Sequence, residues 1–289
     1  MKIFSDNFYG CKLVVIMKRR TFVATSISSL AIAGCGTENS PEELQTSNPG
    51  KLVSRDPNYL RKSRRDLGVM RFAGELPYED YSYQVINDPT LKSPSALVER
   101  FELREENCFI PRDCQMDKQR SEIQGTGAYY GLECKYEMSV YIPPNFHPFG
   151  TFCHVGLNLH AKNNNGTNNT ALIMPLMGGD DKSTRLYAMI FNGKKRERHK
   201  VIPYLDMTGR WTKLEVHSKW HESGFHKIYA NDELVVDYSG YTLGSSSESP
   251  FDLKYGLYRG RVSEFKKRYN MKRYPDQFAY YAAVKMSKL

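Results

Sequence analysis

LECKYEMSVYIP, residues 132–143, alternates apolar and polar side chains along almost its whole length. Successive side chains of an extended chain point to opposite faces, so this alternation creates one apolar face and one charged face. Such a pattern is typical of a strand that covers a core. The apolar face carries Cys134, Tyr136, Met138, Val140 and Ile142, and the polar face carries Glu133, Lys135, Glu137 and Ser139.

The same period of two returns in segments from residue 96 to the end of the chain. Two of these segments are joined to their neighbours by turn sequences, FNGKK (191–195) and ANDE (230–233), which predict β-hairpins. No long helical stripe competes with this pattern. The sequence therefore predicts an all-β protein, an antiparallel β-sandwich of the jelly-roll, concanavalin-like kind. The alternating segments are 96–105, 151–161, 185–191, 211–220, 226–240 and 278–286.

Three regions follow one another along the 289 residues. Residues 1–35 are expected to be an export signal, and residues 36–65 are polar, contain proline and lack an apolar period, which is typical of a tether. Residues 66–289 are expected to form one β-sandwich domain. A chain of this length exceeds the usual single domain, but large sandwiches reach this size as one unit.

The export signal is expected to start at Met17, where MKRRTFVATSISSLAIAGC runs to residue 35. A basic start, an apolar stretch and IAGC resemble a bacterial lipoprotein signal, with cleavage before Cys35 and lipid on its thiol. The Arg19–Arg20 pair, with Phe22 after it, is a weaker sign of twin-arginine export. The apolar run is too short for a membrane-spanning helix. We expect a protein of the bacterial cell envelope, lipid-anchored in the periplasm or at the outer membrane, or secreted.

Basic residues outnumber acidic ones, 41 Lys and Arg against 32 Asp and Glu, and part of this excess belongs to the leader. A mildly basic body suggests an anionic partner, although a basic surface kept for solubility would look the same. Export makes a nucleic acid an unsuitable partner. We expect an anionic polysaccharide as the partner, contact with a membrane only through the lipid anchor, and a monomer.

Four cysteines lie beyond Cys35, and an oxidising envelope favours disulfides among them. Cys108 and Cys114 bracket the short segment FIPRD and are the expected pair. Cys134 and Cys153 lie on apolar strand faces and are either bridged or buried as thiols. None of the spacings resembles a zinc site, so neither a metal nor a cofactor is expected. Asp180 and Asp181 could at most hold Ca²⁺, because this ion prefers oxygen ligands.

Polar and charged side chains occupy the outward face of several predicted strands. In a sandwich one face of each sheet packs inward, so Asn158, His160, Lys254 and Tyr258 all share the outward parity. Arg120 and Glu122 alternate in the same way on their own strand. If these strands meet in one sheet, they form a substrate groove lined with cations, an amide, an imidazole and a phenol.

Four short motifs carry a family resemblance: RFELR (100–104), RSEI (120–123), NLH (158–160) and LKYGLYRG (253–260). In this order and at these separations they resemble the jelly-roll polysaccharide lyases, in particular the heparin lyase I and glucuronan lyase type, with alginate lyases more distant. The resemblance spans roughly residues 95–262. It implies β-elimination on a uronic-acid polymer such as glucuronan, alginate or a heparin-like glycan.

The resemblance also implies roles for individual residues. Tyr258 would be the acid, and also the base in one version of the mechanism, and His160 would be a base or would neutralise the sugar carboxylate. Such donors must stabilise an enolate-like dianion while a base removes the C5 proton. The substrate-binding residues would be Arg120, Asn158 (where the family usually has Gln), Lys254, Arg104 at the end of RFELR, and Glu122, which would orient Arg120.

Two rival functions use the same fold. A lectin-like carbohydrate-binding sandwich would keep the groove and lose the acid and base, whereas His160 and Tyr258 are both present here. A glycoside hydrolase of the laminarinase-like class needs two closely spaced carboxylates. Its usual strand motif, Glu-x-Asp-x-x-Glu, is absent from this sequence.

Overall fold

The computed structural model describes residues 50–64, 66–74, 79–104, 108, 110–148, 152–162, 168–243 and 251–289. The predicted signal, the predicted lipidation site Cys35 and half of the predicted tether lie outside these residues. Within them, no helix has the length and hydropathy that a membrane span requires.

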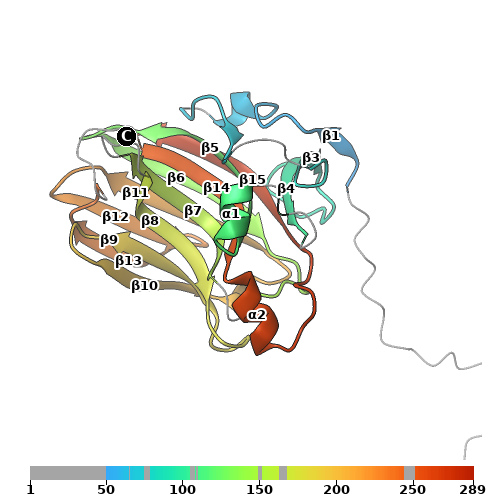
Figure 1. Ribbon diagram of the computed structural model, residues 1–289. Helices are drawn as coiled ribbons and strands as arrows, with labels where there is room; N and C mark the ends of the chain where they lie inside the picture. Colours follow the sequence, from blue (N-terminus) through green and yellow to red (C-terminus); the bar gives the residue numbers. More distant parts are fainter. Residues whose placement is uncertain are drawn as a thin grey trace, which may run out of the picture. The chain divides into compact units, whose positions relative to one another are not determined.

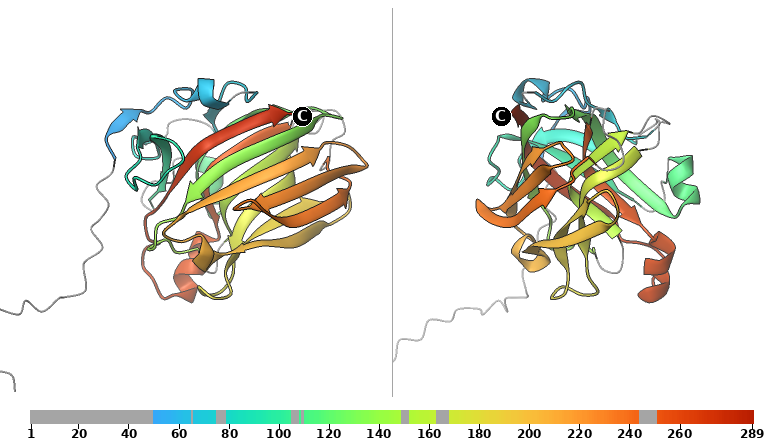
Figure 2. Two further views of the ribbon diagram at one scale, coloured as in Figure 1. Left: turned by 180° about the vertical axis from the view of Figure 1, so that it is seen from behind. Right: turned by 90° about the vertical axis from the view of Figure 1, so that its left-hand side faces the viewer.

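Two antiparallel sheets form the body of the described chain, as the period of two predicts, and Figures 1 and 2 show them stacked as two layers. The first sheet has the order β1 (Leu52–Ser54), β3 (Tyr83–Asn87), β4 (Leu97–Leu103), β15 (Gln277–Lys288), β6 (Glu133–Tyr141), β11 (Trp211–Lys219), β12 (Gly224–Ala230) and β13 (Glu233–Gly240).

The second sheet carries the outward-facing polar residues. Its order is β10 (Arg196–Pro203), β9 (Arg185–Phe191), β8 (Asn168–Met177), β7 (Phe152–Lys162), β14 (Phe251–Gly260), β5 (Lys118–Ala128) and β2 (Arg71–Phe72). The helical elements are short: η1 (Arg61–Arg64), α1 (Pro111–Gln115), η2 (Tyr204–Asp206) and α2 (Val262–Arg268). Figure 1 shows α1 and α2 in front of this sheet, and Figure 2 shows both projecting from that side.

The core lies between the two sheets and is built from alternate residues of each strand. Tyr136, Met138 and Val140 of β6 are buried in it, as the alternation of residues 132–143 predicts. Both predicted hairpins are present, β9–β10 and β12–β13. Asn231 and Asp232 turn the second hairpin with positive φ angles, a conformation that Asn and Asp tolerate better than most residues.

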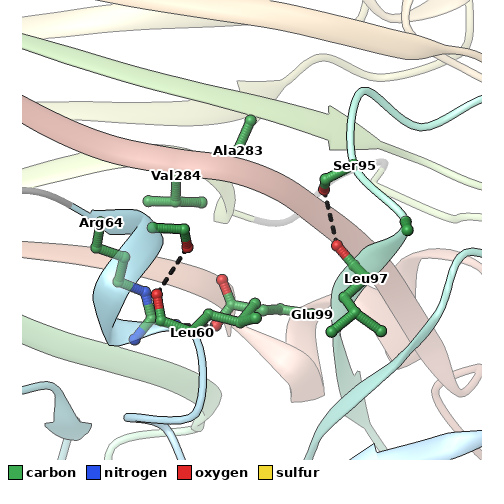
Figure 3. A pocket seen from close by; sticks show the side chains of 9 residues that line it. Leu60, Arg64, Ser95, Leu97, Glu99, Ala283 and Val284 are labelled. Atoms are coloured by element: carbon green, nitrogen blue, oxygen red, sulfur yellow. Dashed lines mark hydrogen bonds and ion pairs between the residues drawn. The ribbon is translucent and has the colours of Figure 1, made fainter.

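The predicted boundary of the tether, residue 65, lies inside the folded body. β1 pairs with β3, and Arg64 of η1 is buried beside Glu99 of β4. The Glu99 carboxylate also accepts hydrogen bonds of 2.7 Å from the hydroxyls of Tyr83 and Tyr255. Figure 3 shows Arg64 and Glu99 at one side of a cavity of about 270 Å³ next to β15. The polar composition of this segment does not indicate burial. Arg64 can be buried because its charge is paired with that of Glu99.

The four described cysteines form the one expected disulfide and leave two free thiols. Cys108 and Cys114 form a disulfide, with their Cα atoms 5.7 Å apart. Cys134 and Cys153 are buried free thiols, which resolves the alternative that the sequence left open.

Candidate active site

The middle strands of the seven-stranded sheet, β5, β14 and β7, bring the predicted site residues onto one face. Tyr258 of β14 pairs with Arg120 of β5 on one side and with His154 of β7 on the other. Four residues earlier on β14, Lys254 pairs with Asn158 of β7. Directly paired residues of neighbouring strands point to the same face, so these side chains share the outer face of the sheet.

Most of these polar side chains are buried although they lie on an outer face. The exposed fraction is 1% for Asn158, 3% for Glu122, 5% for Lys254 and 7% for His154. A polar face that merely met water would leave such side chains exposed. Their packing against one another, with charges of both signs, indicates a built site, since burial of a charge is costly without a partner.

Tyr258 stands between a cation and an imidazole. The Arg120 guanidinium carbon lies 5.3 Å from the centre of its ring, and the ring centres of Tyr258 and His154 are 4.9 Å apart. Burial raises the pKa of Tyr258 to about 12; Arg120 opposes this shift, and the carboxylates of Asp113 and Glu122 add to it. The half-buried Tyr258 hydroxyl makes no hydrogen bond to any described residue. It is a protonated phenol at neutral pH and is free to donate.

His154 is a neutral imidazole in this environment. Burial, together with the positive charges of Arg120 and Arg196, lowers its pKa to about 3. Its Nε2 atom is buried and has no hydrogen-bond partner among the described residues. A buried nitrogen without a partner is costly in a resting protein, so its presence next to Tyr258 points to use in binding or catalysis.

Arg120 is held mainly by Asp113, a residue that the sequence did not single out. The Asp113 carboxylate accepts hydrogen bonds from Nε and from a terminal nitrogen of Arg120, the latter at 2.9 Å. Glu122 lies farther from Arg120, at 3.6 Å. Asp113 belongs to α1, directly before Cys114 of the disulfide. The expectation that Glu122 orients Arg120 stays a prediction, and the structure adds a second carboxylate, that of Asp113, which reaches Arg120 from outside the sheet.

Glu122 also forms a hydrogen bond with Asn158. The Asn158 side-chain amide donates to Glu122 at 3.1 Å, and its oxygen accepts from the backbone N–H of Met174 at 3.4 Å. Burial raises the pKa of Glu122, whereas the nearby charges of Arg120 and Lys254 oppose this shift. Asn158 also has a side-chain hydrogen bond with His154, so its amide is already used by neighbours on this face.

His160 lies on the same face, away from Tyr258 along the strand. It pairs with Asp252 of β14, six residues before Tyr258, and the register of β7 against β8 shifts between residues 159 and 160. Burial and then the charge of Lys254 lower the pKa of His160 well below its usual value. The structure thus places His154, rather than the predicted His160, beside the phenol.

The structure does not bring Arg104 to this face. Arg104 follows β4, which belongs to the other sheet, and its Nε donates to Glu102 at 2.6 Å. Its guanidinium also stacks on the ring of Tyr81, 3.9 Å from the ring centre. The structure therefore places Arg104 apart from the other predicted site residues, and its contact with substrate stays a prediction. The alternation of side chains along a strand does not tell which sheet the strand will join.

The backbone of β14 is irregular at Gly256, between Lys254 and Tyr258. Gly256 has a φ of 121°, and a Cβ atom there would lie 2.4 Å from the backbone oxygen of Ser121. The Tyr281 hydroxyl, from β15 of the other sheet, lies within hydrogen-bonding distance of the backbone oxygens of Gly256 (2.8 Å) and Val155 (3.0 Å). Only glycine tolerates this conformation and this close approach, so Gly256 is required where β14 bends.

Metal ligands do not gather in this region. Across the described ranges, no group of three or more His, Cys, Asp and Glu side chains is arranged to hold a metal ion. The Asp180 carboxylate, a candidate calcium ligand, accepts a 2.7 Å hydrogen bond from the backbone of Ser183.

Comparison with known proteins gives the family. Residues 60–284 match the polysaccharide lyase family. The chain belongs to the polysaccharide lyases. This match spans most of the folded body and agrees with the resemblance that the four short motifs carry. No curated protein sequence matches the chain.

Solved structures show the same fold at low sequence identity. An endo-β-1,4-glucuronan lyase from the fungus Trichoderma reesei is 14% identical, with a TM-score of 0.52 over 77% of this chain and 96% of that one. A variant of alginate lyase Aly36B in complex with an alginate tetrasaccharide is 13% identical, with a TM-score of 0.53 over 84% and 94%. At this identity the two structures establish the β-sandwich fold of this lyase, and its site must be argued from its own residues.

Proposed function

We propose that this polysaccharide lyase cleaves a uronic-acid polysaccharide by β-elimination, with Tyr258 and His154 as the acid and the base. The observation that carries the proposal is the pairing of Tyr258 with Arg120 and His154 on adjacent strands. A phenol, an imidazole and a guanidinium that meet at one point supply the three functions that the reaction needs.

The reaction breaks two bonds of one sugar and needs no water. A base removes the C5 proton, the electron pair forms the C4–C5 double bond, and the bond from C4 to the glycosidic oxygen breaks. That oxygen leaves with the neighbouring sugar and takes up a proton from an acid. A cation near the sugar carboxylate stabilises the enolate-like charge that develops when the C5 proton departs.

The environments of the two groups suit these two tasks. Tyr258, with its pKa raised to about 12, is protonated at neutral pH and suits the acid. His154, with its pKa lowered to about 3, is unprotonated and suits the base. The low pKa makes the free imidazole a weak base. A bound sugar carboxylate would offset the charge of Arg120, which is among the causes of the low pKa, and would thereby strengthen the base.

The short distance between His154 and Tyr258 also allows both groups to regain their starting protonation states after each turnover. After one turnover His154 carries the proton from C5 and Tyr258 is a phenolate. With ring centres 4.9 Å apart, the proton can return from the imidazolium to the phenolate once the product leaves. Arg120, with one fifth of its side chain exposed, is the cation on this face best placed to meet the sugar carboxylate.

A panel of uronate polymers tests the proposal. Glucuronan, alginate and a heparin-like glycan are incubated with the enzyme, and the ultraviolet absorbance of the unsaturated uronate is followed. We expect a rise with at least one polymer and its loss in Tyr258→Phe, which retains the ring but not the proton. Binding of the polymers without any rise would instead identify a lectin-like protein.

We also propose that the chain is a monomeric, lipid-anchored protein of the bacterial cell envelope. The support is the sequence ending in Cys35, which resembles a lipoprotein signal. Mass spectrometry of the mature N-terminus should find acylated Cys35, and Cys35→Ala should abolish its membrane attachment. An unmodified N-terminus upstream of Cys35 in the membrane fraction would refute the anchor.

A further inference from the structure

The centre of the candidate site has little surplus positive charge. Arg120 is paired with Asp113 and lies near Glu122, and the charge of Lys254 acts on Glu122 as well. Asp252 adds a further buried carboxylate on the same face, paired with His160. The cations next to Tyr258 therefore stabilise charge locally but are poorly suited to attract a long polyanion by themselves.

Unbalanced cations lie on the same face at the edge of the sheet, on strands β9 and β10. We call Arg185, Arg196, Arg198 and Lys200 the β10 arm. Arg196 pairs with Phe191, Arg198 with Met189 and Lys200 with Tyr187, so all point away from the core that buries Leu186, Ala188 and Ile190. The one acidic residue of β10, Glu197, lies on the opposite parity with His199.

The charges of the arm are not matched by acids, unlike those on the other sheet. Within the described residues, no carboxylate forms an ion pair with a member of the β10 arm. On the outer face of the eight-stranded sheet, by contrast, Lys135 contacts both Glu137 and Glu215, and Lys285 contacts Glu137. These two lysines of the eight-stranded sheet are thus paired with carboxylates, whereas, among the described residues, the members of the β10 arm are not.

The arm reaches toward the catalytic residues. The Arg196 guanidinium spans β9 and donates a 2.9 Å hydrogen bond to Thr170 of β8, which pairs with His160. The positive charge of Arg196 contributes to lowering the pKa of both His154 and His160. Arg196 is therefore close enough to the site for its charge to be felt there.

One register row joins the arm to the site across the whole sheet. Pairings between neighbouring strands connect one residue from each strand. The row begins and ends with an arginine, and its amide and ammonium groups lie in the middle. In order, the row consists of Arg198, Met189, Ile173, Asn158, Lys254, Gln124 and Arg71.

We infer that the β10 arm binds the acidic groups of the glycan at a distance from the cleaved bond, so that the enzyme acts within long chains. This inference rests on the proposed function. The arm lies four strands from β14, which is about 19 Å at the usual strand spacing. A sugar in an extended 1,4-linked polymer is about as long as one strand spacing. A chain that lies across the strands therefore needs about four sugars on this side to reach the arm.

The test measures binding of size-defined oligoglucuronates and alginate oligosaccharides by calorimetry, in the Tyr258→Phe background to prevent cleavage. Oligomers of different lengths are compared, from those too short to reach the arm to those that span it. We expect the longer oligomers to bind more tightly, and Arg198→Gln/Lys200→Gln to reduce this gain by about tenfold, since two exposed ion pairs are lost.

The control variant Lys213→Gln/Lys227→Gln removes two positive charges from the other sheet. In this variant longer oligomers should still bind more tightly than short ones, by the same factor as without the two substitutions. An equal loss of affinity for short and long oligomers, or no loss, would overturn the inference. Either result is separable from the proposed function, because cleavage of a uronate polymer by the unmodified enzyme is measured independently.

Discussion

Replacing Asp113 by asparagine keeps the shape of the side chain and removes the negative charge that holds Arg120. The charge that is lost belongs to a nearly buried carboxylate, which accepts two charge-assisted hydrogen bonds from Arg120. Breaking a buried ion pair costs about 3–5 kcal/mol. Arg120 is one-fifth exposed and retains Glu122 at 3.6 Å, so we expect a smaller cost of about 2 kcal/mol. For a domain of this size that lowers the melting temperature by about 4–8 °C.

The same substitution has a sharper effect on the pH dependence of catalysis. Asp113 is among the causes that raise the pKa of Tyr258 to about 12. Its removal lowers that pKa, so the proposed acid loses its proton at lower pH and the alkaline limb of kcat/KM moves down. The assay is kcat/KM on the preferred uronate polymer from neutral pH to about pH 11, with thermal unfolding in parallel.

The control is Asp117→Asn, four residues along the chain. The Asp117 carboxylate accepts hydrogen bonds from the backbone and hydroxyl of Ser263 and has no contact with Arg120. It should leave the alkaline limb in place. An alkaline limb that stays fixed or moves upward in Asp113→Asn would refute the role of Asp113 in setting the charge around Tyr258.

Three further predictions concern histidines and a buried ion pair. His154→Gln should reduce kcat by about a hundredfold or more, whereas His160→Gln should mainly raise KM; the reverse result would restore the role first expected for His160. Arg64→Met should destabilise the fold by about 3–5 kcal/mol because Glu99 stays buried without its cation, and the double variant with Glu99→Gln should recover part of this in urea unfolding. Burial lowers the pKa of His226 to about 3, so the free energy of unfolding should fall as the pH decreases from about 6.5 toward 3. The decrease in the free energy of unfolding should be smaller in His226→Gln than in the unmodified protein. An equal decrease in both proteins would contradict this prediction.

The outer face of the site was predictable because side-chain alternation has a period of exactly two residues along a strand. Lys254 and Tyr258 had to share a face once β14 was recognised as a strand, and Asn158 and His160 likewise on β7. The pairing register was not predictable in the same way. It depends on the offset of β7 against β14, which pairs Tyr258 with His154 and Asp252 with His160, and the alternation of side chains leaves this offset open.

The alternation of side chains along the strands also could not predict contacts made by segments outside the sheet. Asp113 reaches Arg120 from α1, and nothing in the alternation of β5 indicates that a disulfide-closed segment covers it. The nearest signal was its position next to Cys114 in the expected disulfide. Asp113 was missed although it contacts the site, whereas Arg104 was expected at the site but lies on the other sheet. The motif RFELR resembles the family, but it does not tell which sheet its strand joins.

Mass spectrometry of the products formed in ¹⁸O-labelled water tests most directly whether cleavage proceeds without water. The account predicts an unsaturated fragment that is lighter by one water molecule than the hydrolysis product, with no label incorporated by bond cleavage when products are sampled before the reducing end exchanges. Saturated fragments that carry ¹⁸O from the moment of cleavage would show hydrolysis and contradict the account.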